Sequence, residues 1–194
     1  MLIVLPQLIV ACGSPSAESQ YVQARYDANT GKLDRLAYDA NKNGTPDSWS
    51  YMNGTAVLRV EIDKDEDGRI ERWEYYGTDQ KLEKVGISRA NDGRVDAWVY
   101  QSVDGTLSRF EVLAKSDGRV SRTEFYEKGA LVRGEEDTDG DGVVDKWETF
   151  AEGALTSVAF DTDGAGRPTR RLVYGKDGSL LRIETGPALQ NTPS

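Results

Sequence analysis

The chain has 194 residues, enough for one domain or a short array of repeats, and only 38% of them are apolar, which favours a thin fold whose side chains stay partly exposed. Its formal net charge is −9, which argues against nucleic acid as a partner, because nucleic-acid binding needs a basic surface. The chain contains no histidine and one cysteine, which excludes an internal disulfide, a thiolate zinc site and a histidine base.

The first segment, residues 1–11, is apolar and has the length of the hydrophobic part of a signal peptide. A helix of this length is too short to span a bilayer, which takes about 20 residues. The stretch Ile9-Val10-Ala11-Cys12 resembles a bacterial lipobox, in which a diacylglycerol is attached to the cysteine and the preceding segment is removed. The resemblance implies that Cys12 is lipidated and becomes the first residue of the mature chain. Residues 12–20 are then expected to form a flexible tether.

The residue after the cysteine bears on location. By analogy with lipoprotein sorting, Gly13 indicates an outer-membrane protein of the bacterial cell envelope, periplasmic or surface-exposed. The segment departs from the signal-peptide pattern in one respect, because no lysine or arginine precedes the apolar run. The alternative is a buried N-terminal strand with Cys12 in its core.

A unit of 24 or 25 residues recurs between residues 21 and 185. In the best-preserved copies a glycine is followed after five positions by tryptophan and after seven by tyrosine, in the pattern Gly-x-Val/Ile-Asp-x-Trp-x-Tyr. The fourth copy is partial and the sixth is eroded, as terminal repeats often are. The recurring glycines are Gly44, Gly68, Gly93, Gly118, Gly142 and Gly166.

Each unit is predicted to be a β-hairpin, because its side chains alternate with a period of two on both sides of a tight turn. The turns end in glycine, as in Asn53-Gly54 and Asp104-Gly105, and such dipeptides are strong hairpin signals. In the second strand of the hairpin the spacing of apolar residues predicts a bulge after a leucine. On the face opposite the tryptophans we expect Ile70, Val95, Val120 and Val144.

The sequence therefore predicts an all-β fold, an antiparallel meander of about six hairpins with 12 or 13 strands. It would form an elongated, twisted sheet of one layer, or a partly curled one. No helix is expected, because glycine or aspartate interrupts every stretch long enough for one. Residues 186–194 show no pattern and are predicted to be a disordered tail.

The Trp-x-Tyr…Gly-x-Leu rhythm resembles the MORN-type hairpin repeats of bacterial proteins, from about Tyr26 to Glu184. The resemblance implies a single-layer, elongated sheet with a scaffold or interaction role, and it supplies no catalytic residue. A β-propeller is disfavoured, because six hairpins would make only three four-stranded blades. A sheet that closes into a barrel is the alternative architecture, and it would remove the two exposed edges.

The connections between hairpins carry the oxygen ligands that Ca²⁺ prefers. Residues 137–148 and 63–74 match the twelve-residue pattern of an EF-hand loop in full, and residues 39–47 match it through position 9. However, a strand after the glycine would carry Glu148, at position 12, away from the metal. The loops therefore resemble the Asp-rich calcium loops between strands of integrin-type β-propellers.

That resemblance implies ligands at loop positions 1, 3, 5 and 9 and a backbone carbonyl at position 7. In the two complete loops these are Asp137, Asp139, Asp141 and Asp145 with the Val143 carbonyl, and Asp63, Asp65, Asp67 and Glu71 with the Arg69 carbonyl. A weaker site is expected at Asp39, Asn41, Asn43 and Asp47. The alternative is that these residues only favour turns, but clustered carboxylates repel one another without a cation.

One face of the sheet is predicted to be lined by aromatic side chains, and two interpretations of it remain open. It is either a covered face held together by cross-strand packing or an exposed platform for a glycan or a protein. By parity, Asp47, Glu71, Asp96 and Asp145 are expected to share this face. Its aromatic residues are Trp49, Trp73, Trp98, Trp147, Tyr51, Tyr75 and Tyr100.

The chain shows no nucleophile–base pair and no phosphate-binding loop, so we expect it not to be an enzyme. The main expectation is a calcium-stabilised, lipid-anchored envelope protein that acts as a structural or protein-interaction module. The alternatives are a glycan-binding or adhesion lipoprotein that uses the aromatic face, and an immunity protein of the antitoxin type built from hairpin repeats. The sequence does not identify the protein or glycan partner.

Overall fold

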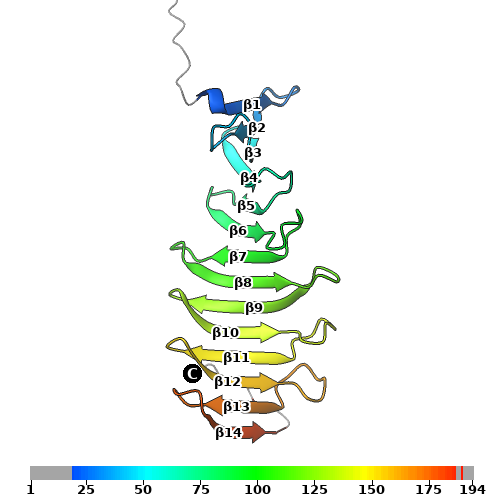
Figure 1. Ribbon diagram of the computed structural model, residues 1–194, viewed down its shortest axis with the longest axis vertical. Coiled ribbons are helices and arrows are strands. Elements are labelled where there is room, and N and C mark those ends of the chain that lie inside the picture. Colours follow the sequence, from blue (N-terminus) through cyan, green and yellow to red (C-terminus); the bar gives the residue numbers. More distant parts are fainter. Residues whose placement is uncertain (1–18, 187–188, 190–194) are drawn as a thin grey trace, which may run out of the picture.

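The computed structural model describes residues 19–186 and residue 189. They form one sheet of 14 antiparallel strands, and each strand pairs with the next along the chain (Figure 1). Strands β1 and β14 are the two edges, so the sheet is open and the predicted all-β meander is confirmed. The strands are β1 (Val22–Tyr26), β2 (Leu33–Tyr38), β3 (Ser48–Asn53), β4 (Ala56–Ile62), β5 (Arg72–Tyr76), β6 (Leu82–Ile87), β7 (Ala97–Gln101), β8 (Leu107–Leu113), β9 (Val120–Glu127), β10 (Ala130–Glu136), β11 (Lys146–Ala151), β12 (Ala154–Phe160), β13 (Arg170–Tyr174) and β14 (Leu180–Thr185).

The N-terminal end contains more structure than the sequence predicted. Strand β1 pairs with β2 along its whole length, which gives seven hairpins instead of about six. This hairpin was expected only in part, because Val22–Tyr26 lacks the tryptophan of the repeat pattern. A single turn of 3₁₀ helix, Ser19–Tyr21, precedes it, where a tether and no helix were expected.

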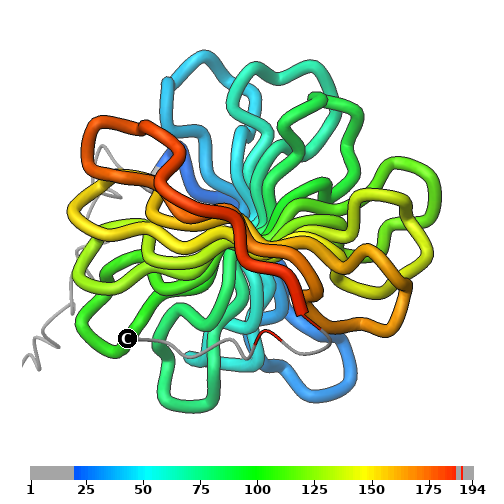
Figure 2. Tube along the Cα trace, turned by 90° about the horizontal axis from the view of Figure 1, so that it is seen from below, coloured from blue at the N-terminus to red at the C-terminus, as the bar shows by residue number. Residues whose placement is uncertain are grey.

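Every hairpin contains a bulge directly after its tight turn. The residue skipped in the register follows a leucine in six of the seven hairpins, which confirms the predicted bulge. Bulges increase the twist of the strand that carries them. Seen along the long axis, successive strands rotate about it and the connections point outward on all sides (Figure 2). The skipped residues are Asp34, Leu58, Glu83, Ser108, Val132, Thr156 and Leu181.

The aromatic residues do share one face, as predicted, but they alternate there with other side chains. Across the strands one row reads Trp49, Glu61, Trp73, Gly86, Trp98, Glu111, Thr123, Glu135 and Trp147. The next row reads Tyr51, Arg59, Tyr75, Lys84, Tyr100, Arg109, Phe125 and Arg133. A cation thus separates each aromatic ring of the second row from the next.

These alternating side chains bind one another as well as packing. The guanidinium of Arg109 lies 3.9 Å from the centre of the Tyr100 ring and 3.0 Å from the Glu111 carboxylate, and the Tyr100 hydroxyl donates to Glu111 at 3.1 Å. Arg59, Tyr51 and Glu61 repeat this arrangement, with 4.4 Å from Arg59 to the Tyr51 ring centre. Such contacts are each worth about 0.5–1 kcal/mol at partly exposed sites.

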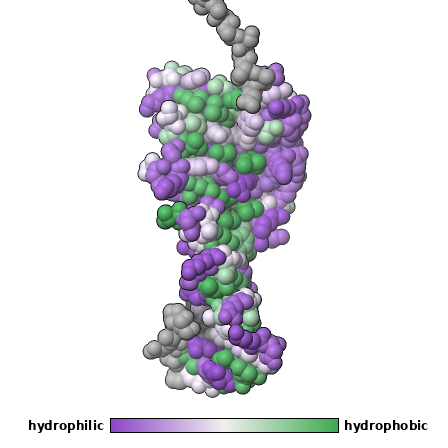
Figure 3. All heavy atoms as spheres, turned by 90° about the vertical axis from the view of Figure 1, so that its left-hand side faces the viewer, coloured by the Kyte–Doolittle hydropathy of each residue, from purple (hydrophilic) through white to green (hydrophobic). Residues whose placement is uncertain are grey.

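The sheet has very little interior, in agreement with the thin fold expected from composition. No large side chain in the described part of the chain is fully buried, and the buried apolar residues are Ala37, Trp73, Val85, Ala97, Val158 and Ala159. Hydrophobic and hydrophilic side chains alternate along the visible face (Figure 3). Among the described residues, none belongs to a helix that is long and apolar enough to cross a membrane. Stability must therefore come from the backbone hydrogen bonds between strands, the side-chain pairs across neighbouring strands, and the contacts within the loops.

Candidate metal centre

Loops connect each hairpin to the next, and five of them share a frame of nine residues: 39–47, 63–71, 88–96, 137–145 and 161–169. The sixth, 114–119, is shorter. In all five the N–H of position 9 donates to the last residue of the strand before the loop, at 2.9–3.0 Å. Strands flank every loop, as expected, and Glu148 lies within β11, where its ligand role at position 12 was excluded.

Position 1 anchors the turn through its carboxylate. Asp63 accepts a hydrogen bond from the N–H of Gly68 at 2.9 Å, and Asp137 accepts one from Gly142 at 2.8 Å. The two glycines have φ values of +85° and +96°. Only glycine takes this backbone conformation readily, which explains its recurrence in the repeat.

The side chain at position 9 turns back onto the start of its loop. Glu71 accepts from the N–H of Lys64 at 2.5 Å, Asp47 from that of Ala40 at 2.9 Å, and Asp145 from that of Thr138 at 3.2 Å. The strands begin one residue later, but the ladder of backbone hydrogen bonds continues through position 9, because the carbonyls of Asp47, Glu71 and Asp145 accept from the first N–H of the next loop at 2.8–2.9 Å. That these residues share the aromatic face stays a prediction.

The parity argument misplaces Val95, at position 8. A Cβ on Gly86 would lie 2.9 Å from a methyl group of Val95 and 3.1 Å from the Trp98 ring. Val95 therefore packs on the face of the tryptophans, where the opposite face was expected, because it precedes β7 and is not part of the alternating strand.

Two of the loops bring three carboxylates together. Ligand oxygens of Asp63, Asp65 and Glu71 lie within 4.8 Å of one another, and so do those of Asp137, Asp139 and Asp145. These residues occupy positions 1, 3 and 9, all predicted as ligands. Calcium–oxygen distances are about 2.3–2.6 Å, so oxygens at such separations can share one ion.

The predicted ligands at position 5 lie outside these two groups. The Asp67 carboxylate caps the N–H of Arg69 at 2.9 Å, and that of Asp141 caps the N–H of Val143 at 2.7 Å. This local bond between an aspartate and the N–H two residues later is common in turns. The roles of the Arg69 and Val143 carbonyls stay predictions.

The third predicted site is already satisfied by other groups. Both oxygens of Asp39 accept backbone N–H bonds, from Asn43 at 3.1 Å and Gly44 at 2.7 Å. The side-chain amides of Asn41 and Asn43 donate to Glu66, which belongs to the next loop. We therefore rank this loop below the two carboxylate groups as a cation site.

Loop 88–96 shows how the fold replaces a cation. Its position 9, Asp96, accepts from the Arg89 side chain at 2.9 Å and from the backbone N–H groups of Arg89 and Ala90. Partial burial alone would raise the pKa of Asp96, but these hydrogen bonds hold it below its ordinary value. In this loop an arginine supplies the positive charge that the carboxylate needs.

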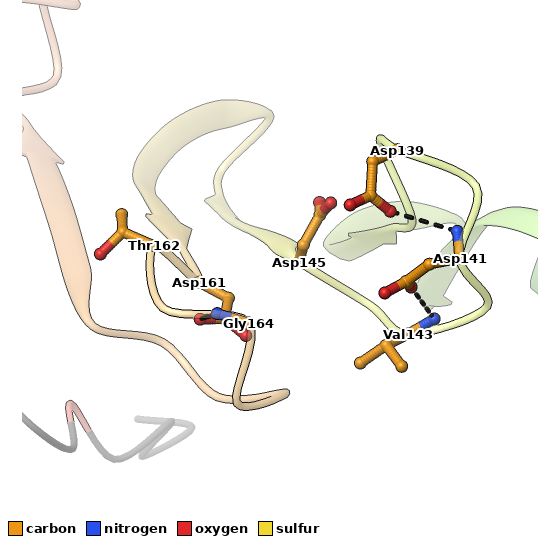
Figure 4. A pocket seen from close by; sticks show the side chains of 7 residues that line it. All are labelled: Asp139, Asp141, Val143, Asp145, Asp161, Thr162 and Gly164. Atoms are coloured by element: carbon orange, nitrogen blue, oxygen red, sulfur yellow. Dashed lines mark hydrogen bonds between the residues drawn. The ribbon is translucent and has the colours of Figure 1, made fainter.

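A pocket of about 180 Å³ lies between loops 137–145 and 161–169 (Figure 4). Both loops contribute carboxylates to it, and those of Asp139 and Asp145 turn toward each other. No basic side chain is among the residues that line it. Its walls are formed by Asp139, Asp141, Val143, Asp145, Asp161, Thr162 and Gly164.

Sequence reasoning missed the contacts between successive loops. Position 4 of each nine-residue loop has positive φ, as at Glu66 and Asn91, and those two side chains reach the preceding loop. The sequence holds no signal for these contacts, because the residue type at position 4 differs between copies and the contacts depend on how the loops stack in the folded sheet.

The remaining predicted sites lie elsewhere. Cys12, its signal segment and most of the tether lie outside the described residues. Of the tail, Gly186 and Leu189 are described, and their N–H groups donate to Thr169 and Pro168 of the last loop. On the aromatic face Trp73 is buried, and cations lie against the rings of Tyr51, Tyr75 and Tyr100.

A comparison with protein-family models found no match, and a search of curated proteins found none. The chain is similar in part to a GtfA/B complex bound to UDP and GlcNAc, with 14% identity, a TM-score of 0.40, and coverage of 53% of this chain and 22% of that one.

Two further solved structures are similar in part. A mutant of S. aureus TarM has 12% identity, a TM-score of 0.27, and coverage of 59% of this chain and 20% of that one. The accessory secretory protein 1,2 and 3 structure from Streptococcus pneumoniae has 14% identity, a TM-score of 0.29, and coverage of 69% and 23%. The chain thus spans between 20% and 23% of the length of the three chains it resembles. At TM-scores this low, the likeness does not bear on function.

Proposed function

We propose that this chain is a non-enzymatic, lipid-anchored repeat protein of the bacterial cell envelope that is stabilised by calcium and acts as a structural or protein-interaction module. The observation that carries the proposal is that loops 63–71 and 137–145 each gather three carboxylates, from loop positions 1, 3 and 9, into one cluster. Positions 1 and 9 are the two ends of a loop, so one cation there would fix the angle between two successive hairpins.

The physical need for such ties follows from the thin sheet. Hydrophobic burial provides little stability, since no large side chain among the described residues is fully buried. The clustered carboxylates of loops 63–71 and 137–145 repel one another, and a divalent cation changes that repulsion into a cross-link. The long open sheet would then offer extended surfaces to a partner.

The calcium part of the proposal is tested by thermal melting of the whole chain. Calcium at about one hundred times its dissociation constant should stabilise the fold by about 2.7 kcal/mol per site, because the ion binds only the folded loop. For a chain of this size that corresponds to a rise of about 5 to 10 °C in Tm for each site. Magnesium at equal ionic strength is the control for general screening.

A matched variant carries Asp63→Asn and Asp137→Asn together. It removes one carboxylate from each group, keeps the side-chain size, and should lose most of the response to calcium. An unchanged Tm for the wild-type chain in millimolar calcium would refute the proposal.

The anchor is tested separately through Cys12. In a bacterial host the wild-type chain should incorporate a radiolabelled fatty acid and sediment with membranes, whereas Cys12→Ser should remain unlabelled and unprocessed. Cys12→Ala serves as a second substitution that removes the thiol. Labelling of either variant would contradict attachment at this residue.

A further inference from the structure

The strongest unexplained feature of the loops is an unpartnered carboxylate oxygen. Asp63 is 4% exposed, and its Oδ1 is buried without a hydrogen-bond partner. In the three other loops that begin with aspartate, both position-1 oxygens accept backbone N–H bonds. Loop 63–71 therefore buries a charged oxygen that its own backbone leaves without a donor, and such burial is costly unless a cation is bound.

A second unpartnered acceptor lies against the same group but belongs to the next loop. Asn91 places its Nδ2 3.0 Å from Asp65 and 3.2 Å from Asp67, while its Oδ1 is buried without a partner. Asn91 is itself held in place, because its backbone carbonyl accepts from Arg69 at 3.0 Å. Among the described residues, the other unpartnered buried side-chain atoms are nitrogens, those of Arg59 and Arg109.

We propose that Asn91 is a ligand of the cation site in loop 63–71, so that one divalent cation joins two successive repeat units. The ion would be held by Asp63, Asp65 and Glu71 and by the side-chain oxygen of Asn91. This inference rests on the proposed calcium function and deepens it.

The side-chain amide of Asn91 can bind the carboxylates when the site is empty and the cation when it is occupied. Without a cation, Nδ2 donates to the two carboxylates. A half-turn of the amide group exchanges Oδ1 for Nδ2, which have nearly the same size and shape. An oxygen then lies beside Asp65, one of the three carboxylates of the group, and neutral amide oxygens are ordinary calcium ligands. The positive φ of Asn91, +50°, is one that asparagine tolerates better than most residues.

The second carboxylate group lacks an equivalent ligand. The residue that corresponds to Asn91 in the loop after 137–145 is Gly164, which has no side chain. The pocket of about 180 Å³ lies there, against Asp139 and Asp141, the counterparts of Asp65 and Asp67. Loop 63–71 should therefore bind calcium more tightly than loop 137–145.

The test changes each of these two residues to the type of the other, in separate variants of the whole chain. Asn91→Gly removes the ligand without backbone strain, and it should weaken calcium binding at loop 63–71 by at least roughly ten-fold. It is measured by titration in a background of Asp137→Asn and Asp139→Asn, which silences the second site. Lys42→Gly is the matched control, because Lys42 also stands at position 4 with positive φ but contacts Tyr21, and it should leave affinity unchanged.

Terbium replaces calcium to count ligands directly. Luminescence lifetimes in H₂O and D₂O report the water molecules on the bound ion, and Asn91→Gly should add one. Gly164→Asn, in a background of Asp63→Asn and Asp65→Asn, should remove one water at loop 137–145 and tighten binding there.

The outcomes separate the two proposals. If calcium does not bind the wild-type chain, the proposed function fails and this inference fails with it. If the wild-type chain binds calcium but Asn91→Gly binds it equally tightly with the same number of waters, only the role of Asn91 is overturned. Should Asn91→Gly not fold, the gain expected of Gly164→Asn decides in the same way.

Discussion

Replacing Gly86 by valine is expected to lower the free energy of unfolding by about 2 to 3 kcal/mol, since an added side chain must displace packed neighbours. Gly86 lies in β6 between Trp73 and Trp98 on the neighbouring strands. A Cβ there would lie 2.9 Å from a Val95 methyl group and 3.1 Å from the Trp98 ring. Urea unfolding followed by tryptophan fluorescence measures the loss.

Two further variants show whether crowding is the cause. Gly186→Val adds the same side chain where nothing lies within 4 Å, and its effect should stay below about 0.5 kcal/mol. Val95→Ala removes the nearest methyl groups, so the double variant Gly86→Val/Val95→Ala should recover part of the loss. A double variant that is destabilised by the full sum of the two single effects would contradict the crowding argument.

The regular part of this fold follows from local patterns, and the sequence predicts it well. Recurring glycines predict the loops, alternation around the tight turns predicts the strands, and the spacing of apolar residues in the second strand predicts the bulges. The positive φ of Gly68 explains why its position needs glycine. The first hairpin was underestimated, because its pairing with β2 uses backbone bonds that Val22–Tyr26 can make without the repeat's tryptophan.

The details that the sequence did not predict depend on contacts between distant segments. The cross-strand order of tryptophan, glutamate and glycine follows from strand register, which bulges shift by one residue. In the loops, the pattern predicted Asp67 and Asp141 as ligands, but each bonds to a backbone N–H of its own turn. Asn91 lies in a loop that looks degenerate by itself, and only the stacking of loops brings it to Asp65.

The two faces of the sheet solve the same problem in different ways. A thin sheet leaves charged side chains half-buried, so each must have a partner within reach across the strands. On the aromatic face, Arg109 satisfies this need with a ring and a carboxylate. On the opposite face, Arg122 of β9 binds three carboxylates, one from each of the strands β9, β10 and β11.

Arg122→Met is therefore expected to lower the free energy of unfolding by about 2 to 3 kcal/mol at pH 7, between the values typical of exposed and fully buried ion pairs. The guanidinium lies 3.0 Å from Glu124, 3.0 Å from Glu136 and 2.7 Å from Glu148. It reaches Glu148 by crossing Gly134, whose missing Cβ leaves the room. Methionine keeps the apolar stem but leaves Glu136 and Glu148 with Lys146 alone and removes the cation from Glu124.

Arg182→Met is the matched control for this substitution. The Arg182 side chain is 61% exposed and pairs with Glu184, so its loss should stay below about 1 kcal/mol. A loss as large as that of Arg122→Met would mean that any arginine on the sheet contributes equally, whatever the number of carboxylates around it.

The dependence on pH separates charge from packing at Arg122. Partial burial would raise the pKa of Glu148, but hydrogen bonds from Lys146 and Arg122 lower it below its ordinary value of 4.5. A carboxylate with a lowered pKa in the folded state contributes stability that is present above its unfolded pKa and is lost as the pH falls through the folded one. The difference between wild type and Arg122→Met should thus be complete above about pH 5 and should shrink steadily below about pH 4. Equal losses at pH 7 and pH 3 in urea unfolding would contradict the ion-pair argument, because the carboxylates around Arg122 are largely protonated at pH 3, whereas a loss confined to the higher pH shows that ion pairs hold this part of the sheet together.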